Sequence, residues 1–396
     1  MRKLNEFARR TQSLKPEGAY QVLARAQALE AAGRDIIHFE IGQPDFETFE
    51  NIREAGRQAI ADGHTRYTPP AGMPALRAAI ARAAGAQRGL HIDPGQVVVG
   101  PGAKPNLFFA ALALIEPGDP VLYPDPGFPT YRSMLELAGG KPVPVPLQEQ
   151  DDFSFDLRAF DRLIRHGTRL IILNSPGNPT GGILPPAALE HIAAAAVKYD
   201  CWVLSDEIYA GLVYDGARAA SIASLPGMQE RTIIVDGFSK TYAMTGWRLG
   251  FGIMPVALAD RMDLLLTHSV GSTAHFTQWA GIEALTGSQE PARRMQREYQ
   301  QRRDLIVQSL RAIPGVTCRT PAGAFYVFTN VKAFGRTSSE ITDLLLEQAG
   351  VAVLPGSAFG QYGEGYLRLS YATSSSQITA GLQRMREALE GLGPAT

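Results

Sequence analysis

The sequence predicts an α/β protein with two parts: a large domain in which helices sandwich a mostly parallel sheet, and a smaller α+β domain. Its 396 residues exceed the size at which a single hydrophobic core usually stops growing. In the middle of the chain, short β-branched runs alternate with longer helical stretches, which is typical of parallel strands joined by crossover helices. From Gln289 onward a charged stretch precedes separate apolar runs, which indicates a different, α+β unit.

The elements of the large domain are predicted from its apolar runs and from the Gly and Pro residues that separate them. The runs expected to form strands are residues 96–99, 120–123, 169–173, 202–205, 232–235 and 249–253. The expected helices, each beginning or ending beside a Gly or Pro, are residues 104–115, 131–137, 185–199 and 255–267. This order predicts a doubly wound sheet.

The second unit draws on both ends of the chain. Its expected elements are a helix over 292–312, hairpin-like apolar runs over 324–329 and 367–372, and a last helix over 376–389. A helix over 20–32 and an extended stretch over 35–41 are separated from the sheet region by a long connection, so we assign them to the same unit. We therefore expect a large domain over 46–285, with 1–45 and 286–396 forming the small domain.

Charge and cysteine content exclude several classes of function. Lys and Arg number 38 and Asp and Glu 39, a formal net charge of −1, and no long like-charged block occurs. Neither nucleic acid nor an anionic membrane is therefore an expected partner, and we expect a small ligand. Cys201 and Cys318 are too few for a disulfide framework or a cysteine zinc site, so no metal is expected and a reducing compartment fits best.

No targeting or membrane segment is predicted. Residues 1–15 carry basic side chains but no apolar core or cleavage site of a secretory signal. The longest apolar run, residues 107–115, is too short to cross a bilayer. We expect a cytoplasmic protein.

Polar residues follow three of the predicted strands, at the ends where ligands gather in an open α/β sheet. They are Asn178 in a Pro- and Gly-rich turn after 169–173, Asp206 and Tyr209 after 202–205, and Ser239 and Lys240 after 232–235. An amide, a carboxylate with a phenol, and an amine at neighbouring strand ends can surround one ring. We therefore predict the ligand site at this edge of the sheet.

Specific motifs occur along the chain in a recognisable order. They are IGQPDF, YTPPAG, NSPGNPTG, SDEIY, FSKTYAMTGWRLG and YLRLSYA. From about Ile41 to Ala372 the sequence thereby resembles the fold-type I pyridoxal-phosphate enzymes, and among them the class I/II aminotransferases that include aspartate aminotransferase. The resemblance implies the fold of that family, with pyridoxal 5′-phosphate as cofactor.

The resemblance makes Lys240 the residue that forms a Schiff base with the cofactor and later moves a proton. A partly desolvated amine near cations loses its proton more readily and becomes a nucleophile. Its alternative, a solvated surface lysine, is disfavoured because Phe238 and Tyr242 flank it in a loop after a strand. Asp206 is expected to pair with the protonated ring nitrogen of the cofactor, with helix N-capping as its alternative.

Further cofactor contacts are implied mainly by the resemblance. Asn178 and Tyr209 are expected to donate hydrogen bonds to the phenolate oxygen of the ring; otherwise they would be an ordinary turn amide and a core tyrosine. Phe128, in the stretch PDPGFP, is expected to stack on the ring, and plain core packing is the alternative.

The phosphate of the cofactor needs backbone donors and a cation. Gly102, Ala103 and Lys104 lead into a predicted helix, where free N–H groups and the helix dipole attract an anion. Arg248 is expected to supply a fork-shaped positive charge, rather than an ordinary surface ion pair. Many relatives carry Ser or Thr three residues before the lysine, where this chain has Gly237, so Ser239 is a possible replacement donor.

Substrate binding is expected to involve Arg368, which alternates with leucines in a strand and clamps the α-carboxylate in the relatives; exposure to solvent is its alternative. Asn178 belongs to the same substrate site. Gly42 lets the backbone approach the substrate closely. Tyr67 matches a tyrosine that reaches the phosphate of the neighbouring subunit, which implies a homodimer with shared active sites.

The expected activity is transfer of an amino group from an α-amino acid to a 2-oxo acid, with aspartate-type substrates ranked first. Aromatic, alanine-like or basic amino acids remain alternatives, as does a lyase, replacement or cyclisation reaction on the same cofactor. Lys104 is a candidate for the distal carboxylate, and His275 borders the pocket in relatives but is expected to be structural. A regulator on this fold is disfavoured, because the residues before Gly42 leave no room for a DNA-binding domain.

Overall fold

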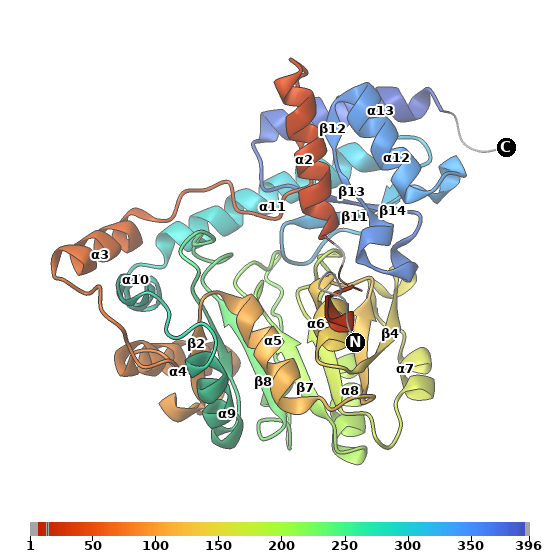
Figure 1. Cartoon of the computed structure of the whole chain (residues 1–396). Coiled ribbons are helices and arrows are strands. Elements are labelled where there is room, and N and C mark those ends of the chain that lie inside the picture. The colour runs from red at the N-terminus through yellow and green to blue at the C-terminus, as the bar shows by residue number, and fades with distance from the viewer. Residues whose placement is uncertain (1–6, 13, 15, 393–396) are drawn as a thin grey trace.

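The structure, a computed structural model, describes residues 7–12, 14 and 16–392. The expectations that involve residues 1–6, 13, 15 and 393–396, on a targeting signal and on the outer ends of the small domain, lie outside the described residues. Figure 1 shows a large sheet between helices and, above it, a smaller unit made from both ends of the chain. No helix among the described residues is both long enough and apolar enough to pass through a membrane.

One large sheet contains all the strands predicted for the middle of the chain. Its strands are β2 Val97–Gly100, β3 Pro120–Asp125, β4 Lys141–Gln148, β5 Ser154–Phe155, β6 Leu170–Asn174, β7 Trp202–Asp206, β8 Thr232–Gly237 and β9 Gly250–Ile253. In the described part of the chain they lie in the order β2-β9-β8-β7-β6-β3-β4-β5. The neighbours from β4 to β8 pair parallel, whereas β9 is antiparallel to both β2 and β8. The predicted fold class is confirmed.

Helices cover both faces of this sheet, which is why its strands are continuous apolar runs. The helices are α3 Glu50–Ala61, α4 Pro74–Arg88, α5 Ala103–Leu114, α6 Thr130–Leu137, α7 Leu157–Leu163, α8 Pro186–Lys198, α9 Val256–Thr267 and α10 His275–Thr286. One face packs against α5, α6 and α9, and the other against α7 and α8, each through its own apolar cluster. Near β2 and β9, α4 and α10 complete a third cluster.

The smaller unit joins residues 18–40 to the part of the chain that follows α10. Its elements are α2 Gly18–Ala31, β1 Ile37–His38, α11 Glu290–Arg311, β10 Thr317–Cys318, β11 Tyr326–Asn330, α12 Ser338–Leu344, β12 Val351–Ala352, β13 Leu354–Pro355, β14 Tyr366–Ser370 and α13 Ser375–Glu390; a short helix, α1 Arg9–Gln12, precedes them. β1 pairs parallel with β12, and β10, β11, β14 and β13 form an antiparallel sheet. The domain boundaries at residues 45 and 285 stay predictions.

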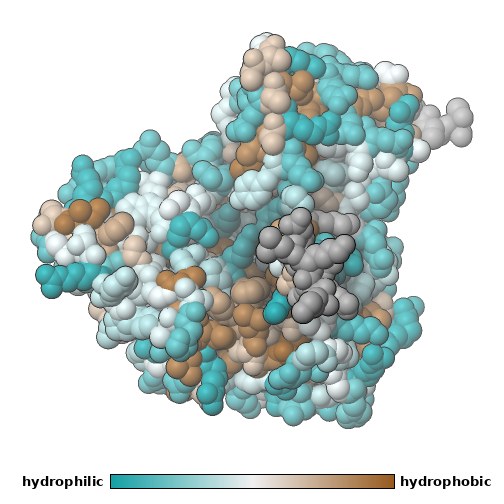
Figure 2. Space-filling model, viewed as in Figure 1, coloured by the Kyte–Doolittle hydropathy of each residue, from teal (hydrophilic) through white to brown (hydrophobic). Residues whose placement is uncertain are grey.

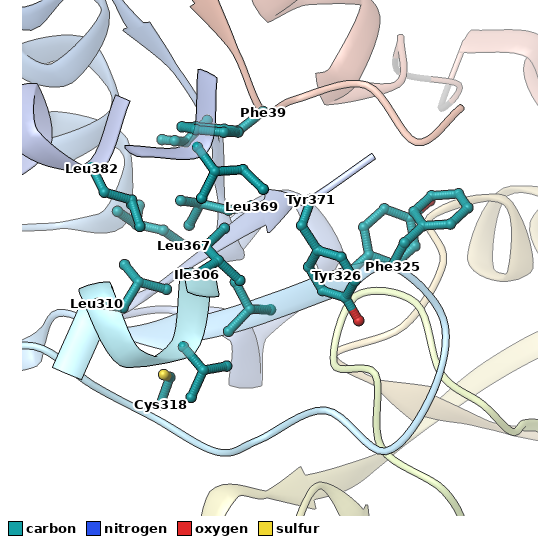
Figure 3. Close-up of a cluster of buried hydrophobic side chains, with 14 of the residues drawn as sticks. Phe39, Ile306, Leu310, Cys318, Phe325, Tyr326, Leu367, Leu369, Tyr371 and Leu382 are labelled. Atoms are coloured by element: carbon teal, nitrogen blue, oxygen red, sulfur yellow. The ribbon is translucent and has the colours of Figure 1, made fainter. Parts of the chain in front are cut away.

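The core of this unit lies between α11, α13, β11 and β14 (Figure 3). Fully buried side chains there include Leu310 on α11 and Phe325 before β11, and Phe39 reaches in from the segment after β1. The two apolar runs predicted as hairpin-like do pair antiparallel, as β11 and β14, although α12 and β12 separate them in the chain. The core therefore fixes β14, the strand that carries Arg368, against the rest of the unit.

Candidate active site

The ends of β6, β7 and β8 bring the predicted polar residues to one edge of the large sheet. Asn174, at the end of β6, pairs in register with Asp206, at the end of β7. The Nδ2 of Asn174 donates to the backbone oxygen of Asp206 at 3.0 Å, and its Oδ1 accepts from the backbone N–H of Asn178 at 2.8 Å. The turn that carries Asn178 is thereby fixed to the neighbouring strand end.

Lys240 lies three residues beyond β8, in a turn, and its amine is turned inward. The Nζ donates to the backbone oxygen of Gly42 at 2.7 Å, and lies 6.0 Å from the ring centre of Tyr209 and 5.6 Å from that of Phe325. Burial lowers the pKa of Lys240 to about 8, helped by the positive charges of nearby cations, Arg368 first among them. About a tenth of this amine is therefore unprotonated at pH 7, far more than of an ordinary lysine.

Asp206 is buried, with 5% of its surface exposed. The hydroxyl of Tyr131, on α6, donates to Oδ2 at 2.7 Å, and the backbone N–H of Ile208 donates to Oδ1 at 3.3 Å. Burial raises the pKa of Asp206 to about 6, although both hydrogen bonds act in the opposite direction. A carboxylate held in this way gains from a cation placed beside it.

Tyr209 and Gly42 meet through a tyrosine that the sequence did not single out. The hydroxyls of Tyr209 and Tyr326 are hydrogen-bonded at 2.8 Å, and burial raises the pKa of Tyr209 well above its ordinary value. A Cβ on Gly42 would lie 2.0 Å from the hydroxyl oxygen of Tyr326. Glycine is required at this position because of that close approach.

Arg368 is buried on β14, with 4% of its surface exposed, and faces the large sheet. Its Nη1 donates to Oδ1 of Asn178 at 3.2 Å, its Nη2 donates to the backbone oxygen of Glu40, and its guanidinium carbon lies 4.4 Å from the ring centre of Tyr326. Within the described residues its Nε is buried without a hydrogen-bond partner. The solvent-exposed alternative for this arginine is wrong.

The expected anion site lies where α5 begins against β9. A Cβ on Gly102, which has a φ of 99°, would lie 2.4 Å from Nη2 of Arg248. A Cβ on Gly250 would lie 2.3 Å from the backbone nitrogen of Ala103. The exposed Arg248 donates from Nη1 to the backbone oxygen of Thr245 at 3.0 Å. Glycines thus let a guanidinium and the start of α5 come together.

Lys104 and Phe128 lie beside the same site. The Nζ of Lys104 lies 5.0 Å above the ring centre of Phe128 and donates to Oε1 of Glu17 at 2.5 Å. The same Glu17 oxygen accepts from Oγ1 of Thr130 at 3.2 Å. Phe128 packs edge-on against Tyr131, with ring centres 5.7 Å apart. The residue before α2 therefore reaches the active site of the large sheet.

The remaining predicted residues lie in different surroundings. Ser239 is buried beside Lys240, whereas Tyr67 is 98% exposed. Gly237 faces β9, and a Cβ on it would lie 3.0 Å from Cα of Gly250, which gives this glycine a packing reason. The His275 ring lies 4.8 Å from that of His64, and burial together with that neighbour lowers its pKa.

The prediction from sequence missed three residues of this site: Tyr131, Tyr326 and Glu17. Their partners lie 75, 117 and 87 residues away in the chain, so no local spacing could reveal them. Tyr131 follows the motif that carries Phe128, and that position was the one available signal. Tyr326 and Glu17 resemble any core tyrosine and any residue that precedes a helix.

Comparison with known proteins identifies the family. The chain matches the model of the class I and II aminotransferases over residues 34–385. It belongs to that family. The resemblance and the activity class predicted from the motifs are confirmed: the protein is an aminotransferase that depends on pyridoxal 5′-phosphate and acts on amino acids and 2-oxo acids.

Individual relatives cover nearly the whole aminotransferase chain. It is 39% identical to the aspartate aminotransferase of Pyrococcus horikoshii over 387 residues, 97% of each chain. It is also 39% identical to aromatic-amino-acid aminotransferase 2 of Thermococcus litoralis over 384 residues, 96% of this chain and 97% of the relative. The Thermus thermophilus aspartate aminotransferase with maleate superposes with a TM-score of 0.93 at 37% identity, covering 97% of this chain and 100% of the other.

The donor set of the aminotransferase fits its cofactor. A phosphate needs a cation beside free backbone N–H groups, which Arg248 and the start of α5 provide. A pyridine nitrogen that carries a proton needs a buried carboxylate, as at Asp206, and an aldehyde needs an amine with a lowered pKa, as at Lys240. These three groups come from separate strand ends of one sheet edge.

Proposed function

We propose that this aminotransferase takes aspartate-type, dicarboxylic amino acids as substrates, with Lys240 and Asp206 as catalytic residues and Arg368 as the clamp for the α-carboxylate. The bound cofactor supplies an electron sink for the carbanion formed at Cα of the amino acid. The geometry at the sheet edge supports these roles. The observation that carries the specificity is the contact of Lys104 with a carboxylate inside the active site.

Lys240 is proposed to bind the cofactor covalently and to move a proton at its Nζ. Its lowered pKa makes the amine a base near neutral pH, and the backbone oxygen of Gly42 holds it in place. Asp206, oriented by Tyr131, keeps the ring nitrogen protonated. Tyr209 and Asn178 would hold the phenolate oxygen of the ring.

Arg368 is proposed to bind the α-carboxylate of the amino acid through a bidentate pair. Its Nη1 and Nη2 are held by Asn178 and by the backbone oxygen of Glu40, which leaves the plane of the fork fixed. Its Nε is buried without a partner within the described residues, so a further acceptor is favoured there.

The side-chain specificity is proposed to rest on Lys104. Its Nζ is bound by the Glu17 carboxylate, so the place beside it accepts a carboxylate. Lys104 is also one of the cations that lower the pKa of Lys240, which puts it within electrostatic range of the reacting amine. A dicarboxylic substrate would replace Glu17 there. The Pyrococcus horikoshii relative named for aspartate and the Thermus thermophilus structure with maleate, a dicarboxylate, support this choice.

The specificity is tested by comparing kcat/KM for aspartate, phenylalanine and alanine with 2-oxoglutarate as acceptor. Lys104→Met is expected to lower kcat/KM for aspartate at least about tenfold more than kcat/KM for phenylalanine, because both donors lose a cation near Lys240 but only aspartate loses an ion pair. Lys198→Met, which alters an exposed lysine on α8, is the matched control. Equal loss for both donors, or a wild-type preference for phenylalanine, would favour the aromatic activity for which the Thermococcus litoralis relative is named.

The active unit is proposed to be a homodimer with shared active sites. Tyr67 is 98% exposed, as expected for a side chain that contacts the phosphate of a second subunit. Figure 2 shows apolar surface over α5 and α9, where Leu112, Val256 and Leu264 are exposed. Sedimentation should give twice the mass of the chain, and Tyr67→Phe should weaken cofactor binding.

A cytoplasmic location is also proposed, supported by Cys201 and Cys318, which are buried and free.

The remaining cofactor contacts are proposed by position. Gly102, Ala103 and Arg248 would hold the phosphate, with Ser239 and Lys104 beside it, and Phe128 would lie against the ring.

A further inference from the structure

A buried ion network lies behind the carboxyl ends of β7 and β8. Arg88, the last residue of α4, has a side chain that is 3% exposed. Its Nε donates to Oε2 of Glu207 and its Nη2 to Oδ2 of Asp236, both at 2.7 Å. Its Nη1 donates to Oε1 of Gln87 at 3.1 Å. One guanidinium therefore bridges carboxylates from two neighbouring strands.

The two carboxylates are neighbours on one face of the sheet. β7 and β8 pair parallel with Asp206 opposite Val235, so the next residues, Glu207 and Asp236, stand side by side on the other face. Like charges directly opposite each other on adjacent strands repel, and the repulsion is strong where water is excluded. Arg88 places positive charge between them. It thereby offsets the repulsion between the two strand ends.

Every carboxylate oxygen of this network has a donor. Oε1 of Glu207 accepts from the hydroxyls of Ser205 at 2.9 Å and Ser221 at 2.6 Å. Oδ1 of Asp236 accepts from the backbone N–H of Gly237 at 2.7 Å. Buried ion networks seldom stabilise a fold more than apolar side chains of equal volume would. Because every carboxylate oxygen of this network is hydrogen-bonded although such networks add little stability, we look for a role other than stabilising the fold.

The network is connected to the active site through the backbone. Glu207 directly follows Asp206, and Asp236 precedes Lys240 by four residues, one residue before the end of β8. The negative charges of Asp236 and Glu207 also raise the pKa of Asp206, in addition to its burial. Movement of either strand end would displace one of the two proposed catalytic residues relative to the other.

We propose that Arg88 is a positioning residue for the amino-transfer reaction: by joining Glu207 to Asp236 it fixes the ends of β7 and β8, and with them Asp206 and Lys240. The inference rests on the roles proposed above for Asp206 and Lys240. Arg88 lies on the opposite face of the sheet from Asp206 and acts only through these two carboxylates.

The test compares Arg88→Lys with the wild-type holoenzyme. Lysine keeps the charge, but a single ammonium cannot reproduce the planar fork that joins both carboxylates. We expect kcat to fall roughly 10- to 100-fold with little change in KM for the amino acid, because placement rather than binding is lost. The pH at which the visible absorbance of the bound cofactor titrates should also shift, and the cofactor should dissociate more readily.

The matched control is Arg303→Lys on α11. Arg303 is also 3% exposed and pairs with two carboxylates, Asp215 and Asp304, neither of which is next to a proposed catalytic residue. Its two carboxylates are more than half exposed, so it should lose less stability than Arg88→Lys, and it should keep the wild-type kcat and cofactor titration. An Arg88→Lys enzyme that is destabilised, yet keeps both wild-type values, would show that Arg88 is merely structural.

A second variant keeps the test decisive if Arg88→Lys does not fold. Glu207→Gln removes one charge and retains an acceptor for Ser205 and Ser221, so it should fold and lower kcat with little change in KM. An unchanged kcat in this variant would contradict the inference. Failure of the proposed function looks different, because the wild-type protein would then itself lack the absorbance of a cofactor bound at Lys240.

Discussion

At the ends of β7 and β8 the chain buries charged groups beside one another, whereas the cluster drawn in Figure 3, in the small unit, consists of buried hydrophobic side chains. Asp206 and Lys240 both have pKa values moved toward neutrality by burial. Leu310 and Phe325 are equally buried and carry no charge. Burial of charged groups in the first region lowers the stability of the fold and keeps those groups reactive. Burial of apolar side chains in the second region stabilises the fold.

This comparison separates activity from stability. Substitutions at the strand ends should abolish chemistry at little cost in stability, or even with a gain, because a desolvated charge is removed. Substitutions in the apolar core should cost stability through a cavity and leave the chemistry of the folded fraction intact. The following variants test that separation, beginning with the largest expected effect.

Lys240→Ala should have the largest effect. Without the Nζ, no residue at this position can bind the cofactor covalently or move the proton at Cα, so turnover should fall at least roughly 10⁴-fold. The measurement is steady-state turnover with an amino donor and a 2-oxo acid, together with the visible absorbance of the bound cofactor. Multiple turnovers by this variant would refute the role of Lys240. Lys198→Met is again the control.

Asp206→Asn should lower kcat at least about 100-fold while stabilising the cofactor-free protein. In the fold, the pKa of Asp206 is raised from its ordinary 3.8 to about 6, so its ionised form costs folding free energy that grows as pH rises from about 4 to 6. The variant should therefore gain at most about 3 kcal/mol at pH 7 and nothing near pH 4.

Urea unfolding of both cofactor-free proteins at pH 4, 5.5 and 7 measures that difference. A variant that is less stable than the wild type at pH 7 would show that Asp206 contributes to the fold, and the proposed contrast between the two regions would fail.

Leu310→Ala should show the reverse behaviour. Leu310 is fully buried on α11 in the core of Figure 3, so truncation leaves a cavity and should cost roughly 2 to 5 kcal/mol. At a temperature where the variant is folded, kcat and the cofactor absorbance should match the wild type. The two regions would prove to be coupled if kcat fell in proportion to stability.

Much of the large domain could be predicted from sequence because its strands are buried on both faces and therefore read as apolar runs. β4 escaped prediction for a physical reason: Pro142, Pro144 and Pro146 interrupt it, and proline is normally excluded from strands. Every second residue of β4 is therefore without a backbone N–H. Lys141 donates its N–H to the backbone oxygen of Asp119, on the β3 side. Because N–H groups alternate in direction along a strand, the proline nitrogens lie on the side away from β3.

The active-site residues that lie within the sequence motifs could be predicted. Lys240, Asp206 and Asn178 follow strands whose ends meet, and that rule places them together. The residues that hold them in place were not predictable. Tyr131 contacts Asp206, and Arg88 contacts Glu207 and Asp236, only because the fold brings distant segments together, and side chains of these types occur on many helices with no such role.

The smallest effect on stability is expected for a substitution of His38, at the end of β1. Its Nδ1 is 2.7 Å from Oε1 of the buried Glu40, whose backbone oxygen holds Arg368, and its Nε2 is 3.1 Å from Oε1 of Glu30. The hydrogen bond to Glu40 is the main cause that raises the pKa of His38 from its ordinary 6.5 to about 9.

A histidine whose pKa is raised by folding stabilises the protein fully below pH 6.5, and this stabilisation disappears as pH rises through about 9. With a third of the side chain open to solvent, we expect about 1 to 2 kcal/mol. Lys240 acts in the opposite direction, since its lowered pKa makes the fold more stable as pH rises past about 8. The contribution of Lys240 is the same in wild type and in His38→Gln, so it cancels in the difference between their free energies of unfolding. Urea unfolding at pH 6.5 and 9.5 measures this difference, which should be smaller at pH 9.5. An equal difference at both pH values would mean that His38 is neutral in the fold.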